Sequence, residues 1–166
     1  MHKEVRGSLN VAANQKYAIV AAEFNKLITS LLAAAAVDAL QRHGAAEGQI
    51  LQVWVPGSLE LATAARPLAQ CGSFAAIICL GCIIRGQTDH YDHVAGQAAA
   101  QIAAIGPQTG VPVLFGVITA DTTEQAMDRA GLKMGNVGWN AACSAIEMAD
   151  TMAVLKKICK AEGSTL

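Results

Sequence analysis

The feature of this sequence that most restricts its fold is an unbroken apolar run from Phe74 to Ile84. A strand that faces solvent on one side alternates polar and apolar residues, whereas a strand covered on both faces does not. The run is too short to cross a bilayer, since a spanning helix needs about 20 residues, and it ends at the charged residue Arg85. It therefore predicts a central strand of a sheet that carries helices on both faces.

The rest of the chain alternates strand-like and helix-like segments. Further strands are expected over Lys16–Ala22, Ile50–Val55 and Val111–Thr119. Helices are expected over about Leu27–Arg42, from Ser58 with Pro67 late in the helix, over about Tyr91–Ile105 before Gly106-Pro107, from Asp121 or Thr122 to Ala130, and from about Asn136 to Cys159. This order favours an α/β fold in which a parallel sheet lies between two helical layers. Ligands of such folds bind where the carboxyl ends of the strands meet.

The length suits a single domain over residues 1–166. Residues 1–12 are interpreted as an N-terminal edge strand or arm, available to a neighbouring subunit, and residues 160–166 as a flexible tail. The sequence contains neither an internal repeat nor a low-complexity linker.

Composition excludes several classes of protein. Apolar residues make up 53% of the chain and charged residues 15%, which excludes intrinsic disorder. The 12 basic and 13 acidic residues give no basic excess for nucleic acid. The first residues lack the apolar stretch of a signal peptide, so a cytoplasmic protein without membrane partners is expected. So little charge also favours a large buried interface between subunits.

The five cysteines are an odd number, which favours free thiols in a reducing compartment. Cys79 and Cys82 have the CxxC spacing of a metal site, but they lie within the apolar run. Buried small hydrophobic side chains are therefore favoured over structural zinc.

The segment from Arg85 to His90 is the richest in functional groups. Gly86 permits close backbone approach, and the free N–H groups of the following helix could hold an anion. Histidine is the residue type best suited to moving protons near neutral pH, so His90 is a candidate acid–base group. The alternatives are a helix cap with a surface histidine, or a metal site formed by His90 and His93 with Asp89 and Asp92.

Three further side chains have a functional and a structural interpretation. Phe24, followed by Asn25, leaves a strand end and is either a platform for a planar heterocycle or an aromatic packed under the next loop. Glu60 either binds ligand hydroxyls or stabilises its helix. Arg129 either pairs with phosphate or satisfies a helix end.

Three common signatures are absent from the sequence: the GxxxxGK[ST] loop, the GxGxxG fingerprint and the GxSxG elbow. Their absence counts against nucleotide hydrolysis by a P-loop, Rossmann dinucleotide binding and serine-hydrolase chemistry.

Taken together, five segments resemble the lumazine synthases of riboflavin biosynthesis. These segments are Phe24-Asn25, Val55–Glu60, Leu80–Tyr91, Phe115–Thr119, and Glu124–Gly131 with Lys133 and Gly135-Asn136 beyond it. They occur in the family's order over about Glu4–Leu155, without a large gap. Five motifs in the right order are far more specific than any one of them.

The resemblance implies a flavodoxin-like three-layer sandwich. It implies condensation of 5-amino-6-(D-ribitylamino)uracil with 3,4-dihydroxy-2-butanone 4-phosphate to 6,7-dimethyl-8-ribityllumazine, the penultimate step of riboflavin biosynthesis. No metal and no organic cofactor is expected. The subunits are expected to form pentamers with the sites between neighbours, up to an icosahedral shell of 60 subunits, with riboflavin synthase as a further partner.

The resemblance also implies site residues. The pyrimidine and its ribityl chain are expected to contact Phe24, Asn25, Ser58, Leu59, Glu60, Cys82, Ile83 and Ile84, with Phe24 stacked on the ring. Phosphate is expected to be bound by Gly86, Gln87 and Thr88, and by Arg129 of the adjacent subunit, whose Phe115 closes the ring site. His90 and Arg129 are the expected catalytic residues.

Two departures from the family pattern bear on activity. Val137 stands where a lysine is usual, and Glu23 stands where an arginine usually precedes the Phe-Asn pair. Ser58 for a common alanine and Ala62 for a frequent proline are milder changes. Loss of a charged contact costs about 1–3 kcal/mol, so the alternatives are a catalytically weak or inactive relative that binds flavin or lumazine, and a shell-forming protein.

Overall fold

The structure is a computed structural model that describes residues 2–87 and 90–163. The elements follow in the order β1 (Tyr17–Ala22), α1 (Lys26–Arg42), the 3-10 turn η1 (Glu47–Gln49), β2 (Ile50–Val55), α2 (Glu60–Gln70), β3 (Ala76–Ile84), α3 (His90–Thr109), β4 (Val113–Ala120), α4 (Thr123–Arg129) and α5 (Val137–Ala161).

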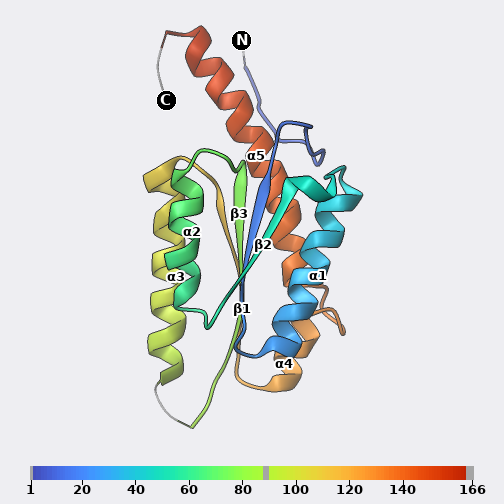
Figure 1. Ribbon diagram of the computed structural model, residues 1–166, viewed down its shortest axis with the longest axis vertical. Helices are drawn as coiled ribbons and strands as arrows, with labels where there is room; N and C mark the ends of the chain where they lie inside the picture. Colours follow the sequence, from blue (N-terminus) through green and yellow to red (C-terminus); the bar gives the residue numbers. More distant parts are fainter. Residues whose placement is uncertain (1, 88–89, 164–166) are drawn as a thin grey trace.

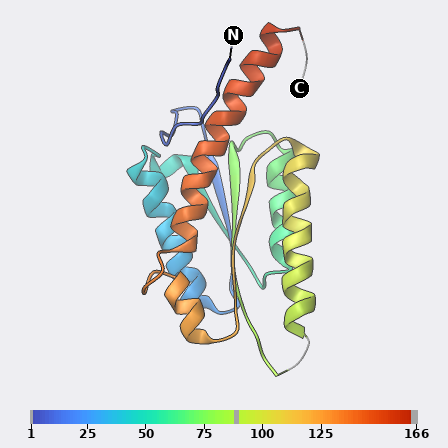
Figure 2. The ribbon, with the colours of Figure 1, turned by 180° about the vertical axis from the view of Figure 1, so that it is seen from behind.

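The four strands form one parallel sheet in the order β2-β1-β3-β4. Helices α2 and α3 cover one face of the sheet, and α1, α4 and α5 cover the other (Figure 1). The same three layers are visible from behind, where the last turns of α5 extend beyond the sheet (Figure 2). This arrangement confirms the expected α/β sandwich of flavodoxin-like type.

The core consists of two apolar clusters, one on each side of the sheet. All six residues of β1 are buried, and β3 is buried from Ala76 to Ile83. These two central strands therefore contribute to both clusters, as the unbroken apolar run predicts. None of the helices that the structure describes is long and apolar enough to span a bilayer.

Alanine and glycine bring α1 and α5 close together. Three alanines of α1 and four of α5 are buried in the cluster between these helices and the sheet. Gly138, in the first turn of α5, lies against the backbone of Leu32 so closely that a Cβ atom there would overlap the Leu32 carbonyl oxygen. Small side chains allow short distances between helix axes, so the alanine-rich composition is a requirement of this packing.

The expected end of α3 is wrong. The helix passes Gly106-Pro107 and ends at Thr109. Proline near the end of a helix removes only one N–H donor, and buried Ile102 and Ile105 anchor this stretch. Gly110 ends the helix instead, with φ at 70° and its N–H donating to the Gly106 carbonyl at 2.9 Å.

The other boundaries differ by a few residues. Helix α2 begins at Glu60, two residues after the predicted start at Ser58, and Pro67 lies within it without breaking it. Thr122, one of the two candidate caps of α4, accepts a hydrogen bond from the Gln125 N–H at 3.2 Å. Helix α5 extends to Ala161, so residues 160 and 161 of the expected tail are helical.

The N-terminal segment lies along α5 of its own chain. Residues 2–11 form no strand here, and the Ser8 N–H donates to the Asp150 carboxylate at 2.7 Å. Gly7 lies against the backbone of Glu147. An edge strand shared with a neighbouring subunit stays a prediction.

The contact between α1 and α5 gives a test of the packing. We expect Gly138→Ala to destabilise the protein by about 1–3 kcal/mol or more, because its methyl group overlaps main-chain atoms that cannot rotate away. Thermal unfolding followed by circular dichroism measures the change. Gly96→Ala in α3 is the matched control, since a Cβ there meets no atom within 4 Å and should stabilise by up to about 1 kcal/mol. Equal melting temperatures for the two variants would contradict this account.

Candidate functional site

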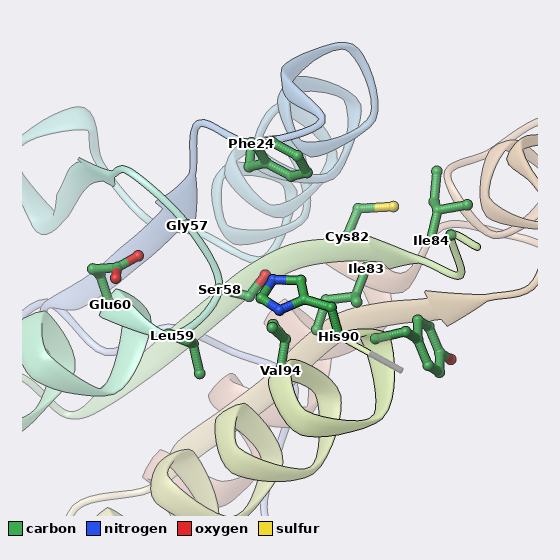
Figure 3. Close-up of a pocket in the computed structure, with 12 residues that line it drawn as sticks. Phe24, Gly57, Ser58, Leu59, Glu60, Cys82, Ile83, Ile84, His90 and Val94 are labelled. Atoms are coloured by element: carbon green, nitrogen blue, oxygen red, sulfur yellow. The ribbon is translucent and has the colours of Figure 1, made fainter. Parts of the chain in front are cut away.

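A pocket of about 350 Å³ lies at the carboxyl ends of β1 and β3, between the beginnings of α2 and α3 (Figure 3). Its lining consists of Phe24, Gly57, Ser58, Leu59, Glu60, Cys82, Ile83, Ile84, Gly86, His90, Tyr91 and Val94. The pocket is at the edge of the sheet where the direction of the parallel strands predicts a ligand site. Nine of its residues are among those expected to form the site.

Phe24 presents an exposed aromatic ring at the end of β1. The strand end is fixed to the β2–α2 turn, because the Glu23 N–H donates to the Val55 carbonyl at 2.7 Å and the Phe24 N–H to the Pro56 carbonyl at 3.1 Å. The residue as a whole is 71% exposed. A rigidly held aromatic surface at a pocket edge suits stacking on a planar ligand.

Asn25 shapes the pocket from behind and is not among its lining residues. It is the one non-glycine residue of the described chain with positive φ, at 57°, a conformation that asparagine tolerates better than most residues. Its side-chain amide donates to the Cys82 carbonyl at 2.8 Å, which ties the end of β1 to β3. The structure thus gives Asn25 a structural contact, and its expected contact with the ligand stays a prediction.

The turn after β2 places a hydroxyl and a carboxylate in the pocket. Ser58 is one of two buried polar residues in the described chain, and its side chain lies at the pocket wall. Glu60 begins α2. A Cβ atom added to Gly57 would lie only 2.9 Å from the Glu60 carboxylate oxygen, so the glycine leaves room for this carboxylate. Both groups can bind hydroxyls of a ligand.

His90 is the first residue of α3 and lines the pocket across from the β2–α2 turn (Figure 3). Val94, one turn further along the helix, lines the same wall. Among the described lining residues, Glu60 is the one carboxylate and His90 the one histidine, and no lysine or arginine is present. An anion bound here would depend on N–H groups near the start of α3 and on a cation from elsewhere.

Three acidic side chains near the site are already paired. Arg85, directly after β3, donates hydrogen bonds to Asp92 and Asp121. These hydrogen bonds, chiefly the one to Asp92, raise the pKa of the Arg85 guanidinium above its ordinary value. Glu23 lies outside the lining and binds Lys26 at 2.6 Å. The negative charge that Glu23 brings to this region is therefore balanced within its own turn.

Several expected site residues lie elsewhere or cannot be placed. Gln87, Phe115 and Arg129 do not line the pocket, and Thr88 lies outside the described residues. Phe115 of β4 lines a second hollow of about 210 Å³ together with Val137 at the start of α5. Arg129 is exposed at the end of α4. The single chain therefore brings together one part of the expected site.

Sequence reasoning missed three lining residues: Gly57, Tyr91 and Val94. Val94 follows His90 by four positions, the spacing that places two side chains on one face of a helix. That spacing was the available signal for Val94. Gly57 and Tyr91 are direct neighbours of predicted residues.

The chain combines a flavodoxin-like sandwich with a small-molecule pocket at the carboxyl edge of its sheet, which defines a class of α/β ligand-binding proteins and enzymes. A family model described as 6,7-dimethyl-8-ribityllumazine synthase matches residues 14–153. A 6,7-dimethyl-8-ribityllumazine synthase of Gloeobacter violaceus is 52% identical over 147 residues, which cover 86% of this chain and 81% of the relative. One from Synechocystis sp. is 52% identical over 141 residues, covering 82% and 85%. The chain belongs to the 6,7-dimethyl-8-ribityllumazine synthase family.

Metal ligands do not gather in the described structure: no group of three histidine, cysteine, aspartate or glutamate side chains is arranged for a metal ion there. Asp89, one member of the alternative metal set, lies outside the described residues. The two cysteines of the CxxC spacing are buried on opposite faces of β3, since Cys79 belongs to one core cluster and Cys82 to the other.

The pocket cysteine gives a chemical test of the site. Burial raises the pKa of the Cys82 thiol to about 11 and that of Cys79 to about 12. Both stay protonated at pH 8, and thiols react far more slowly than thiolates. We therefore expect iodoacetamide to label exposed Cys71 of the folded protein while Cys79 and Cys82 stay unmodified. Peptide mass spectrometry measures the labelling, and urea-unfolded protein is the control in which all five react. Rapid labelling of Cys82 in the folded state would contradict the described burial.

Proposed function

We propose that the protein condenses 5-amino-6-(D-ribitylamino)uracil with 3,4-dihydroxy-2-butanone 4-phosphate to form 6,7-dimethyl-8-ribityllumazine, phosphate and two water molecules. The observation that carries the proposal is the meeting of Phe24, Glu60 and His90, from three separate segments, around one pocket. Family membership gives these residues their chemical context.

The pyrimidine fits the wall formed by β1, β2 and β3. Its ring stacks on Phe24, and its ribityl hydroxyls bind Ser58 and Glu60. The apolar side chains of Cys82 and Ile83 cover the ring edge, where a pocket of about 350 Å³ suits a molecule of this size. Hydrogen bonds to a buried hydroxyl and a carboxylate select a polyhydroxylated chain over an apolar one.

The phosphate of the second substrate fits the beginning of α3. Gly86 lines the pocket there, and the dipole of a helix that extends from His90 to Thr109 favours negative charge at this end. Because the described lining contains no cation, we assign the neutralising charge to Arg129 of a neighbouring subunit, with Gln87 and Thr88 as further ligands. Phe115 of that neighbour would cover the ring.

The reaction needs proton transfer and charge stabilisation more than a protein nucleophile. The pyrimidine amine attacks the butanone carbonyl, and loss of water gives an imine. Removal of an adjacent proton lets phosphate leave with the bonding electron pair, and ring closure with a second loss of water completes the product. His90 accepts and returns the protons, while the α3 N-terminus and Arg129 stabilise the departing phosphate. Holding two substrates in register supplies much of the remaining rate.

Turnover of both substrates tests the proposal. We expect the wild-type protein to form the lumazine, and His90→Ala to lower kcat by about 100-fold or more, because general acid–base catalysis contributes about 10²–10⁴-fold. Product absorbance measures the rate. His93→Ala is the matched control, since this exposed histidine of the same helix is absent from the lining. Equal loss of activity in both variants would argue against a specific role of His90.

A catalytically weak relative that binds flavin or lumazine is the second candidate, and Val137 is the observation that favours it. Val137 lies beside Phe115 in the second hollow, where the family usually has a lysine. The same assay on Val137→Lys separates the two candidates. An inactive wild type with an active Val137→Lys variant would support the second candidate, whereas strong wild-type turnover would show that the lysine is dispensable.

The proposed site requires assembly, so we also assign the protein to pentamers that can form a shell, in the cytoplasm and with riboflavin synthase as a partner. Large apolar side chains support the assembly: Phe115 is 42% exposed, Leu132 71% and Met134 57%. Monomeric proteins rarely expose large apolar side chains in this number, because contact of apolar surface with water is unfavourable.

Light scattering tests the assembly. We expect a mass of at least five subunits of 17.2 kDa, because burial of these side chains drives association. Leu132→Asp should reduce the mass, and Lys133→Gln, which lowers the net charge by the same one unit at the next position, should reduce it less. A monomer at micromolar concentration would overturn both the pentamer and the shared site.

A further inference from the structure

Arg85 joins three elements at the edge of the pocket. Its backbone N–H donates to the Ala120 carbonyl at 2.8 Å, which extends the pairing of β3 with β4. Its Nε donates to Asp121 at 3.0 Å, while Nη1 and Nη2 donate to the two oxygens of Asp92 at 3.2 and 3.1 Å. The guanidinium also stacks on the Tyr91 ring, 4.2 Å from its centroid.

The three side-chain contacts come from two segments, the first turn of α3 and the residue after β4. Asp92 and Tyr91 belong to the first turn of α3, and Asp121 follows β4. The Asp121 N–H in turn donates to the Gln125 side chain of α4 at 2.8 Å. One planar side chain therefore fixes the start of α3 against the ends of two strands. Bidentate and stacked contacts of this kind define an orientation, which a single surface ion pair does not.

Arg85 is poorly suited to bind the substrate phosphate directly. It directs its Nε and both terminal nitrogens at two carboxylates, whose combined charge exceeds its own. It is also absent from the pocket lining, whereas His90, Tyr91 and Gly86 beside it are present. Its effect on the site must pass through the residues that it holds.

We propose that Arg85 is a positioning residue, which rests on the function proposed above: through Asp92 and Tyr91 it fixes the first turn of α3, and thereby His90, relative to β3 and β4. The pyrimidine contacts at Phe24, Ser58 and Glu60 come from other elements and do not depend on it. Arg85 therefore affects the reaction step more than pyrimidine binding.

The test compares Arg85→Met, Arg85→Lys and Asp121→Asn with the wild-type protein. We expect Arg85→Met to lower kcat by at least about tenfold, because displacement of a catalytic group by about 1 Å costs up to about 100-fold. The Kd of 5-amino-6-(D-ribitylamino)uracil, measured by calorimetry, should change by less than about twofold. Lysine should not restore kcat, since it lacks the planar fork, and Asp121→Asn should give an intermediate loss.

Arg42→Met is the matched control. Arg42 donates through Nε to both oxygens of Asp38 at 3.0 Å, and its guanidinium lies 6.0 Å from the Trp139 ring centroid. The Arg42→Met variant therefore loses an ion pair and an aromatic contact, as Arg85→Met does. Arg42 is the last residue of α1, whereas Phe24 precedes the first turn of that helix. We expect the kcat of Arg42→Met to stay within about twofold of the wild type.

Two results would overturn the proposal. If Asp121→Asn tightened binding of inorganic phosphate and Arg85→Lys kept full activity, Arg85 would be a direct phosphate ligand. Hydrogen exchange gives the second test and needs no turnover: amides of residues 94–98, whose acceptors lie in the first turns of α3, should exchange at least about tenfold faster in Arg85→Met, with α1 and α5 unchanged. Unchanged exchange would overturn the positioning role alone, whereas an inactive wild type would overturn the proposed function and the catalytic part of this inference.

Discussion

The parallel pairing of β1 with β3 is the constraint on which the rest of the structure depends. Both strands are almost wholly buried, and their register places Ala21 beside Leu80 at the carboxyl end. Because the strands share one direction, the segments that follow them emerge at the same edge of the sheet. The platform of Phe24 and the loop that begins at Arg85 are adjacent for this reason. The positions of the site residues thus depend on the backbone pairing of two buried strands with apolar side chains.

The sequence was sufficient to predict the elements, their order and the layers. The reason is physical: β1 and β3 admit no polar residue, and the helices keep their apolar faces toward the sheet. The boundaries were less predictable, because the end of a helix depends on tertiary contacts. Proline at position 107 suggested an end to α3, but Ile102 and Ile105 anchor that stretch to the sheet and Gly110 supplies the turn.

Much of the candidate site was also predictable, since nine expected residues line one pocket. Asn25 shows the limit of residue type as evidence. An amide beside an aromatic ring suits ligand binding, yet here it donates to the Cys82 carbonyl and holds two strands together. Arg85 shows the converse limit, because no spacing in the sequence indicates that one side chain meets Asp92, Asp121 and Tyr91. Such contacts exist only after the sheet has formed.

The pocket draws its walls from segments that are far apart along the chain, from Phe24 to Val94. None of these segments can retain a bound molecule if the sheet opens. A ligand therefore binds the native state and not the unfolded chain, and at 100 times its Kd it adds about 2.7 kcal/mol to the free energy of unfolding. A bound ligand therefore also protects each subunit from proteolysis, because a protease cleaves the opened chain.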